Sequence, residues 1–243
     1  KVYRMTDDIS GFHHVPGYAE LIEQEIIHKM DKVIITSRNL EARARALGAK
    51  DIYYLPACIE CHPFNTGVAA EPEDLKLIPP PRIVYIGAIE SWLDVALLEH
   101  CAQELSECSF IFIGAPKLDL SASLRHENVY ILGSRNYGSL PAYLRNCQVG
   151  IIPFKKGKLA ESASPIKFYE YMASELPVVS IETAELRALN SPAFLAKDKR
   201  EFVDMIKSAL KLSKEERESF VEFARENTWE QRYQQLKAIL GLG

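Results

Sequence analysis

The chain has 243 residues, of which 47% are hydrophobic and 26% are charged, and its formal net charge is −4. This length suits one large or two small domains, and this composition is typical of a globular protein. The negative charge disfavours nucleic-acid binding, which needs a basic face, and no apolar run approaches the length of a membrane span. We therefore predict no nucleic-acid partner.

The first part of the chain alternates predicted strands and helices. The strands fall at 1–5, 32–36 and 51–55, and the helices at 18–30 and 40–47. Such alternation indicates a parallel sheet. Ser37 is expected to cap the second helix. The first helix is amphipathic, and we expect its apolar face to turn inward at Leu21, Ile22, Ile26 and Ile27.

Only about two strand–helix units precede Pro56, too few for a complete dinucleotide-type domain. We therefore expect the N-terminal domain to be truncated in this chain. Two adjacent carboxylates, Asp7 and Asp8, follow the first predicted strand, where parallel α/β proteins usually place function, and His14 follows in a loop. A helix cap or a solvated turn explains each of these residues equally well.

A boundary is predicted where periodicity ends. Residues 63–81 contain Gly67, Pro72 and three consecutive prolines at 79–81, which is typical of a stiff, extended connector. The expected organisation is a remainder of an N-terminal domain at 1–65, a linker at 66–81, a second domain at 82–215 and C-terminal helices at 216–243.

The five cysteines are odd in number and scattered, which suits free thiols in a reducing cytoplasm. Cys58 and Cys61 with His62 have the spacing of part of a zinc site, but no second pair completes four ligands. We predict no metal.

The second domain is predicted to hold strands at 82–86, 110–113, 129–132 and 150–153, with helices at 92–105, 140–146, 202–212, 215–226 and 229–240. Three strands end at Gly87, Gly114 and Gly133. This pattern fits either a backbone that passes close to a ligand or plain turn chemistry. No GxGxxG follows any strand, so a nicotinamide or flavin site lacks its fingerprint. The last helix follows Thr228 as a cap, and its apolar stripe is expected to be core: Trp229, Tyr233, Leu236 and Ile239.

The segment from Ser162 to Ser180 contains the most specific candidate for a binding site. Ser164 and Pro165 predict a helix start, with the hydroxyl as cap, and Lys167 then falls in the first turn. A cation there opposes the helix dipole, unless an anion such as phosphate binds beside the free amides. Glu170 lies on the same side of the helix. The pair is either a surface ion pair or a clamp that holds phosphate and neighbouring hydroxyls.

Two loops add further candidates. The stretch 133–138 could present Arg135 and Tyr137 to a nucleobase. The basic run at 155–158 is either a solvated loop or a source of one phosphate-binding lysine, Lys155 or Lys156.

The ordered set of segments resembles bacterial polysaccharide-building glycosyltransferases of the GT-B fold, similar to family 4. The segments that carry the resemblance are SPIKFYEYMASELPVV, VIITSRNLEARARALGAKDIYYLPA, RIVYIGAIESWLDVALLEH, NVYILGSRNYGSLPAYLRNCQVGIIPF and NTWEQRYQQL. The resemblance implies an α/β fold with two Rossmann-like lobes built on parallel sheets, the N-terminal lobe incomplete here. It also implies that the last helix braces the first lobe.

The resemblance further implies a site for a nucleotide-diphosphate sugar. By position, Lys167 would contact the donor diphosphate, with Ser164, Gly87, Lys155 and Lys156 beside it. Glu170 would contact the ribose, and Arg135 and Tyr137 the nucleobase. Asp7 or Asp8 would act as the base toward a sugar or lipid-linked acceptor. No metal or other cofactor is required. The expected location is the cytoplasm, at the inner membrane face for many relatives, and pairing with the absent N-terminal portion is a further expectation.

Three departures from this family are visible. Ser162 stands where many relatives carry a glutamate that contacts the donor sugar, with Glu161 one residue earlier. The usual arginine and lysine are absent after Gly87. Glu175 replaces the glycine that normally ends the helix, at a position expected to be left-handed. Two alternative functions stay open: a sugar-nucleotide epimerase of the same fold, and a non-catalytic nucleotide-binding or assembly module.

Overall fold

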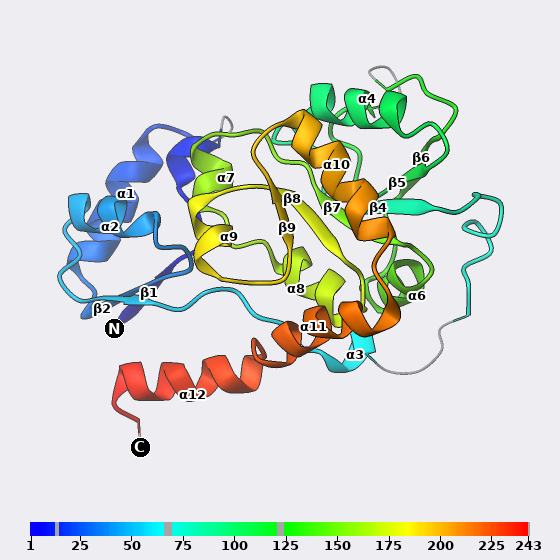
Figure 1. Ribbon diagram of the computed structural model, residues 1–243. Coiled ribbons are helices and arrows are strands. Elements are labelled where there is room, and N and C mark those ends of the chain that lie inside the picture. The colour runs from blue at the N-terminus through cyan, green and yellow to red at the C-terminus, as the bar shows by residue number, and fades with distance from the viewer. Residues whose placement is uncertain (13–14, 66–69, 121–123, 243) are drawn as a thin grey trace.

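The computed structural model describes residues 1–12, 15–65, 70–120 and 124–242, which form two α/β lobes (Figure 1). The first lobe holds a three-stranded parallel sheet in the order β1-β2-β3. Its strands are β1 (Val2–Met5), β2 (Lys32–Ile35) and β3 (Ile52–Tyr54), and its helices are α1 (Tyr18–His28) and α2 (Leu40–Ala46). A short 3₁₀ turn, η1 (Ile9–Gly11), follows β1. The predicted parallel sheet is confirmed.

The second lobe holds a six-stranded parallel sheet in the order β6-β5-β4-β7-β8-β9. Its strands are β4 (Arg82–Ile86), β5 (Ser109–Ile113), β6 (Val129–Gly133), β7 (Val149–Ile152), β8 (Val178–Ile181) and β9 (Phe194–Ala196). From β4 the chain adds strands in one direction, and from β7 in the other. The order therefore reverses between β4 and β7, where sheets of this kind open a crevice at their carboxyl ends.

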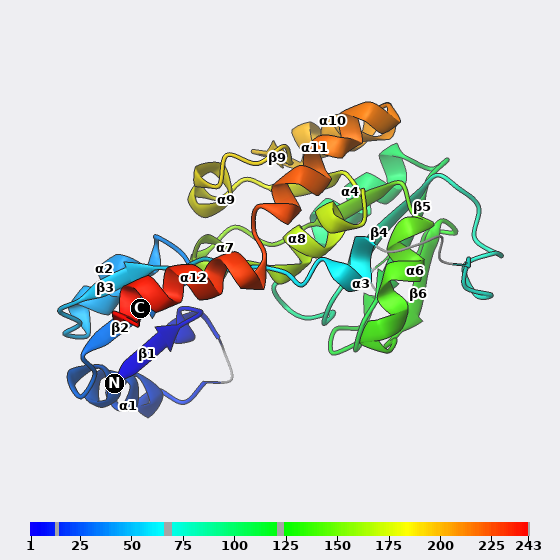
Figure 2. The same cartoon turned by 90° about the horizontal axis from the view of Figure 1, so that it is seen from below.

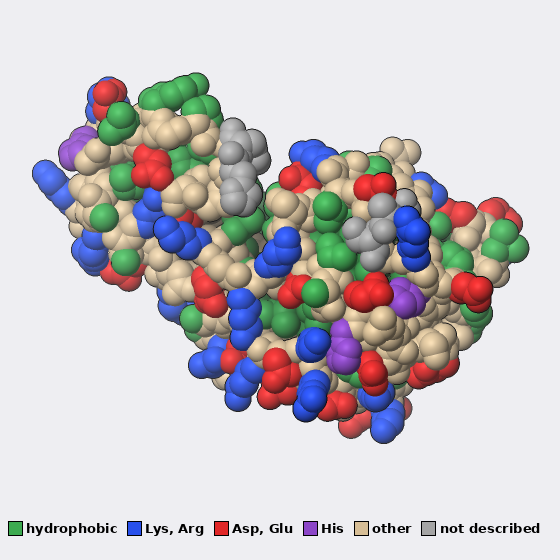
Figure 3. Space-filling view, turned by 90° about the horizontal axis from the view of Figure 1, so that it is seen from above, with side chains coloured by type: hydrophobic (Ala, Val, Ile, Leu, Met, Phe, Trp, Pro, Cys, Tyr) green, Lys and Arg blue, Asp and Glu red, His purple; other side chains and the backbone are tan. Residues whose placement is uncertain are grey.

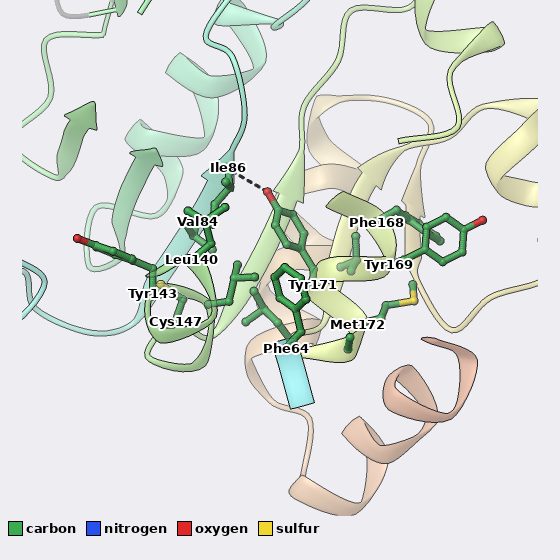
Figure 4. Close-up of a cluster of buried hydrophobic side chains, with 14 of the residues drawn as sticks. Phe64, Val84, Ile86, Leu140, Tyr143, Cys147, Phe168, Tyr169, Tyr171 and Met172 are labelled. Atoms are coloured by element: carbon green, nitrogen blue, oxygen red, sulfur yellow. Dashed lines mark hydrogen bonds between the residues drawn. The ribbon is translucent and has the colours of Figure 1, made fainter. Parts of the chain in front are cut away.

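Helices cover both faces of the larger sheet. Alternation along the strands separates two cores: Val84 and Ile86 of β4 face one, while Ile83 and Tyr85 face the other. The first core is closed by α6 (Leu140–Arg145), α8 (Ile166–Ala173) and α11 (Lys214–Arg225), as Figure 4 shows in part, and the second by α4 (Val95–Glu104) and α10 (Lys199–Leu210).

Four shorter or terminal elements complete the fold. They are α3 (His62–Asn65), α7 (Lys158–Ser162), α9 (Ala184–Ala188) and α12 (Trp229–Leu240). Helix α12 begins where predicted, with Thr228 as the N-cap residue in a capping box. Figure 2 shows α12 beside the first lobe.

The expected linker packs against the second lobe. Ala57, Ile59 and Phe64 lie in the core of that lobe with Leu75 and Ile78, although the sequence places the first three in the N-terminal domain. Ile59 also pairs with Thr228 in an isolated parallel bridge. The packing boundary therefore falls near Pro56 rather than at residue 65.

The predicted orientation of α1 is wrong. Ile27 is buried, but Leu21, Ile22 and Ile26 are exposed. The helix instead buries Glu23, which accepts hydrogen bonds from Tyr3 Oη at 2.9 Å and Arg43 Nη2 at 2.7 Å. The partnered carboxylate takes the inward position that periodicity assigns to aliphatic side chains.

The predicted core stripe of α12 is also wrong. Trp229 and Tyr233 are exposed, Leu236 and Ile239 are half-buried, and the buried residue of this helix is Arg232. Ser37 likewise does not cap α2, because its hydroxyl donates to Glu185 Oε2 at 3.2 Å, across to the second lobe. For Ser37 a polar contact with a distant segment overrides the local pattern, whereas Arg232 bonds Asn227 and Gln235, which are close to it in sequence.

The close fit of β7 against α8 provides a stability test. A Cβ added at Gly150 would lie 2.4 Å from Tyr171 Cδ2, and the Tyr171 hydroxyl accepts a hydrogen bond from the Ile86 amide at 2.7 Å. Gly150→Ala should therefore lower the free energy of unfolding by about 1–3 kcal/mol in urea denaturation. Gly17→Ala is the matched control, since a Cβ there meets nothing within 4 Å. Equal stability of the two variants would contradict this packing.

Candidate functional site

The candidate site lies at the carboxyl edge of the larger sheet, where the strand order reverses. Gly87 follows β4, Phe154 follows β7, and α8 begins just beyond. Figure 3 shows the surface hollowed between the two lobes. The start of α8 therefore lies near the edge of the sheet where a crevice is expected for this strand order.

Lys167 is a largely buried cation in the first turn of α8. Its Nζ donates to Tyr85 Oη at 3.2 Å and lies 4.5 Å from the Tyr85 ring centroid and 5.1 Å from that of Phe154. Burial lowers the pKa of Lys167 to about 8, and nearby Glu170 opposes the shift. Burial also raises the pKa of Tyr85 to about 12, so the hydroxyl stays neutral. The ammonium is thus held by rings and a hydroxyl, with no carboxylate in ion-pair contact among the described residues.

Gly87 makes room for this ammonium. A Cβ at residue 87 would lie 2.5 Å from Lys167 Nζ and 3.2 Å from Tyr85 Oη, and the backbone there has a φ of +143°. Both facts require glycine. Gly114 is equally constrained, since a Cβ there would lie 1.8 Å from the Gly87 carbonyl oxygen. At these two positions glycine is required by close approach to other groups of the protein, and a close approach to a ligand stays a prediction.

The start of α8 differs from the prediction. Pro165, rather than Ser164, is the N-cap residue, and no side chain caps the helix. Ser164 Oγ instead accepts a hydrogen bond from the Ala57 amide at 3.1 Å, which ties the helix start to the incoming chain. The first-turn amides are therefore without the side-chain cap that most helix starts have, which suits anion binding.

Glu170 lies one turn further along α8 and is 8% exposed. It accepts a hydrogen bond from Tyr137 Oη at 2.9 Å, and burial raises the pKa of its carboxyl group. The Tyr137 ring is exposed and packs edge-on against Phe64 at 5.6 Å between centroids. The structure thus brings Lys167, Glu170 and Tyr137 together around one helix.

The guanidinium of Arg135, which was expected to contact a nucleobase, bonds to other groups of the protein. It donates to Asp74 Oδ2 at 2.5 Å, to Tyr143 Oη at 2.9 Å and to the carbonyls of Leu132 and Ser134. These bonds hold the loop before α6 against the chain that precedes β4. Tyr137 therefore remains as the loop's exposed aromatic group.

The two loop lysines point to different partners. Lys155 Nζ donates to the Ser91 carbonyl at 2.8 Å, which joins the loops after β4 and β7. Lys156 lines a separate pocket of about 340 Å³ with Asp94, Asp198 and Lys197. Only Lys155 contacts the loop that follows Gly87.

The N-terminal candidates separate as well. Asp8 caps η1 and pairs with Arg43 at 3.0 Å, which is a structural use of its carboxylate. Asp7 has no ion pair among the described residues, and burial raises its pKa. His14 lies outside the described residues.

Glu161 and Ser162, where the sequence departs from the family, both take part in the contact between the lobes. Asn39 Nδ2 donates to the Glu161 carbonyl at 2.6 Å, and the Asp8 amide donates to Ser162 Oγ at 3.4 Å. Glu185 is 1% exposed and accepts from the Arg38 amide at 2.7 Å and Tyr54 Oη at 2.5 Å. Sequence reasoning missed Glu185, because a glutamate at the start of a short helix carries no signal of burial.

Sequence reasoning also missed Tyr85 and Phe154 as supports of Lys167. A tyrosine two residues before a strand-end glycine was the available signal. Among the described residues, no group of three or more histidine, cysteine or carboxylate side chains could hold a metal ion. Within the same residues, no helix is both long and apolar enough to cross a membrane.

Solved structures match this fold over nearly the whole chain. HepE from Anabaena, determined in complex with UDP and glucose, is 15% identical with a TM-score of 0.77, and the match covers 99% of this chain and 71% of that one. Sucrose-phosphate synthase from Thermosynechococcus elongatus is 16% identical with a TM-score of 0.72, over 99% and 67%. The two parallel lobes with a crevice at the strand reversal define an α/β protein of the GT-B type.

The family model of Glycosyl transferases group 1 matches residues 80–212, which is more than half of the chain. The chain belongs to this family. Among curated proteins it is 25% identical over 179 residues to TuaH of Bacillus subtilis (strain 168), whose name assigns it to teichuronic acid biosynthesis. That match covers 70% of this chain but 45% of the relative, so the chain spans about half the length of this relative.

The buried charge of Lys167 should cost stability. Lys167→Met removes the charge but keeps the unbranched side chain, so we expect it to raise the free energy of unfolding at pH 7 by about 1–3 kcal/mol. The folded-state pKa of Lys167, about 8, lies below the unfolded value of 10.5, so the unfolded wild type binds more protons between these values. Wild-type stability therefore rises across this window and the advantage of the variant shrinks.

Urea denaturation at pH 7 and pH 9.5 measures this difference. Lys158→Met, which removes an exposed lysine nearby, should change stability little at either pH. A Lys167→Met variant no more stable than this control at pH 7 would contradict the burial of an uncompensated charge.

Proposed function

We propose that this chain is the donor-binding portion of a glycosyltransferase that transfers a sugar from a nucleotide-diphosphate sugar to an acceptor hydroxyl. The observation that carries the proposal is Lys167, a buried ammonium beside an uncapped helix start at the sheet's crevice. Burying a cation without a carboxylate partner is unfavourable unless an anion arrives to pair with it. A diphosphate bridging the ammonium and the amides satisfies both.

The same geometry suggests how the reaction is assisted. When the bond between the sugar and the diphosphate breaks, negative charge grows on the departing phosphate oxygen. Lys167 and the first-turn amides of α8 stabilise that charge without having to reorganise. Gly87 and Ser164 shape this pocket, and Lys155 joins its loops. Metal is not required in this proposal, because the helix and the lysine carry the charge.

Of the remaining groups, some contact the donor nucleotide and one acts on the acceptor. Glu170, held by Tyr137, accepts hydrogen bonds from the ribose hydroxyls, and the exposed Tyr137 ring stacks on the nucleobase beside the loop that Arg135 anchors. Asp7, whose pKa burial raises, takes the proton of the acceptor hydroxyl. Asp8 is the weaker candidate because Arg43 already pairs with it, and Lys156 the weaker phosphate ligand because it lines a different pocket.

The comparisons suggest the substrate class. HepE was determined with UDP and with UDP-glucose, so a uridine nucleotide is the first donor to test. The name of TuaH, which refers to teichuronic acid biosynthesis, supports a polysaccharide as the product. We further propose a sugar or lipid-linked acceptor, met at the inner membrane face. The names of these relatives favour neither an epimerase nor a non-catalytic module.

Titration calorimetry with UDP, GDP, dTDP and CMP tests the donor site. One nucleoside diphosphate should bind, and Lys167→Ala and Glu170→Ala should each weaken it by roughly 10–100-fold, the worth of a hydrogen bond to a charged group. Lys158→Ala is the control and should bind normally. Binding that is tight in both site variants would refute the assignment.

The pKa of Lys167 predicts a proton linked to binding. At pH 8–9 much of the free protein has a neutral Lys167, and a diphosphate favours the charged form, so binding should take up a proton. Calorimetry in two buffers of different ionisation enthalpy measures this uptake. This uptake should be lost in the Lys167→Ala variant. Identical apparent enthalpies in both buffers at pH 8.5 would contradict the mechanism.

A further inference from the structure

A second pocket lies away from the candidate donor site, where α12 reaches the first lobe. It has a volume of about 440 Å³, and its polar lining is Arg38, Tyr54, Asn227, Arg232 and Gln235. These residues come from the turn after β2, from β3, from α12 and from the position two residues before α12. Neither Lys167 nor Glu170 lines this pocket.

Arg232 is the unusual feature of this pocket. It is 7% exposed, yet its guanidinium bonds only neutral groups: Asn227 Oδ1 at 2.5 Å and Gln235 Oε1 at 3.2 Å. Its Nε is buried without a hydrogen-bond partner. No carboxylate among residues 1–12, 15–65, 70–120 and 124–242 forms an ion pair with it. A buried, unpaired charge of this kind is costly.

Arg38 brings a second unpaired cation to the same pocket. Its guanidinium lies 4.0 Å from the centroid of the Tyr54 ring, and within the described part of the chain it too has no ion pair. Stacking on tyrosine fixes the direction of the planar fork while leaving its N–H donors available.

The nearest buried carboxylate does not neutralise this pair. The two carboxylate oxygens of Glu185 accept hydrogen bonds from Ser37 Oγ, the Arg38 amide and Tyr54 Oη. It therefore serves the contact between the lobes and makes no ion pair with either guanidinium. Two guanidinium groups, one of them nine-tenths buried with an unused N–H, therefore line one pocket.

We propose that this pocket binds a phosphate group, held by Arg232 and Arg38. A phosphate offers more acceptor oxygens than a carboxylate, so it can accept from both guanidinium forks and from the Gln235 amide at once. Apolar side chains line the rest of the pocket, among them Leu189 and Ile239. The group bound is therefore either free phosphate or the phosphate of a monoester with an apolar tail.

The experiment uses the Lys167→Ala protein, in which the proposed donor site is disabled, so that failure of the donor assignment and failure of this one are distinguishable. Inorganic phosphate is titrated by calorimetry at constant ionic strength set with chloride, because non-specific attraction would be screened equally in all samples. Octyl phosphate is titrated in parallel, and tighter binding of the ester identifies an apolar-tailed ligand while equal binding identifies phosphate alone.

Adding Arg38→Gln should weaken phosphate by at least tenfold, and adding Arg232→Gln should weaken it further. Arg125→Gln removes an exposed guanidinium of the second lobe and should change nothing. Arg38 is exposed, so its variant tests the pocket even if Arg232→Gln destabilises α12. Absence of phosphate binding at millimolar concentration, or binding unchanged by Arg38→Gln, overturns the proposal.

Discussion

The structure depends on one unfavourable interaction, the burial of the Lys167 ammonium at the electropositive start of α8. Everything around it accommodates that charge: the ring faces of Tyr85 and Phe154, the absent side chain at Gly87, and a carboxylate one turn away at Glu170. In the proposed function, the cost of burying this charge is offset when the donor diphosphate binds beside it. The strand order reverses between β4 and β7, which is where sheets of this kind usually bind ligands.

The two terminal helices show a common pattern. In α1 the buried polar residue is Glu23, and in α12 it is Arg232, while most aliphatic residues of the α1 stripe and the aromatic residues of the α12 stripe are exposed. Periodicity cannot distinguish these cases from ordinary amphipathic helices, because it reports that one side is apolar and not which side is covered. Glu23 is held by Arg43 of another helix, whereas Arg232 bonds neutral neighbours close to it in sequence.

Much of the fold was predictable from local chemistry. Every described strand except β9 follows from propensity and turn rules, as does the cap at Thr228. The left-handed Glu175, with a φ of 60°, agrees with the resemblance, in which glycine normally holds this position. The association of Lys167 with Glu170 follows from helical spacing. Three features could not be predicted from local sequence: Ser164 does not cap α8, Arg135 pairs with Asp74, and Glu185 is buried. Each depends on a partner dozens of residues or more away in sequence.

The contact between the lobes includes hydrogen bonds to Glu185, Glu161 and Ser162. Water can replace such bonds when two surfaces separate, at far less cost than exposing hydrocarbon. The chain crosses between the lobes at residues 56–59 and 227–228, where Ile59 and Thr228 pair in an isolated bridge. These two short segments are the covalent connection about which the lobes would move to admit the substrate of the proposed reaction and to release its product.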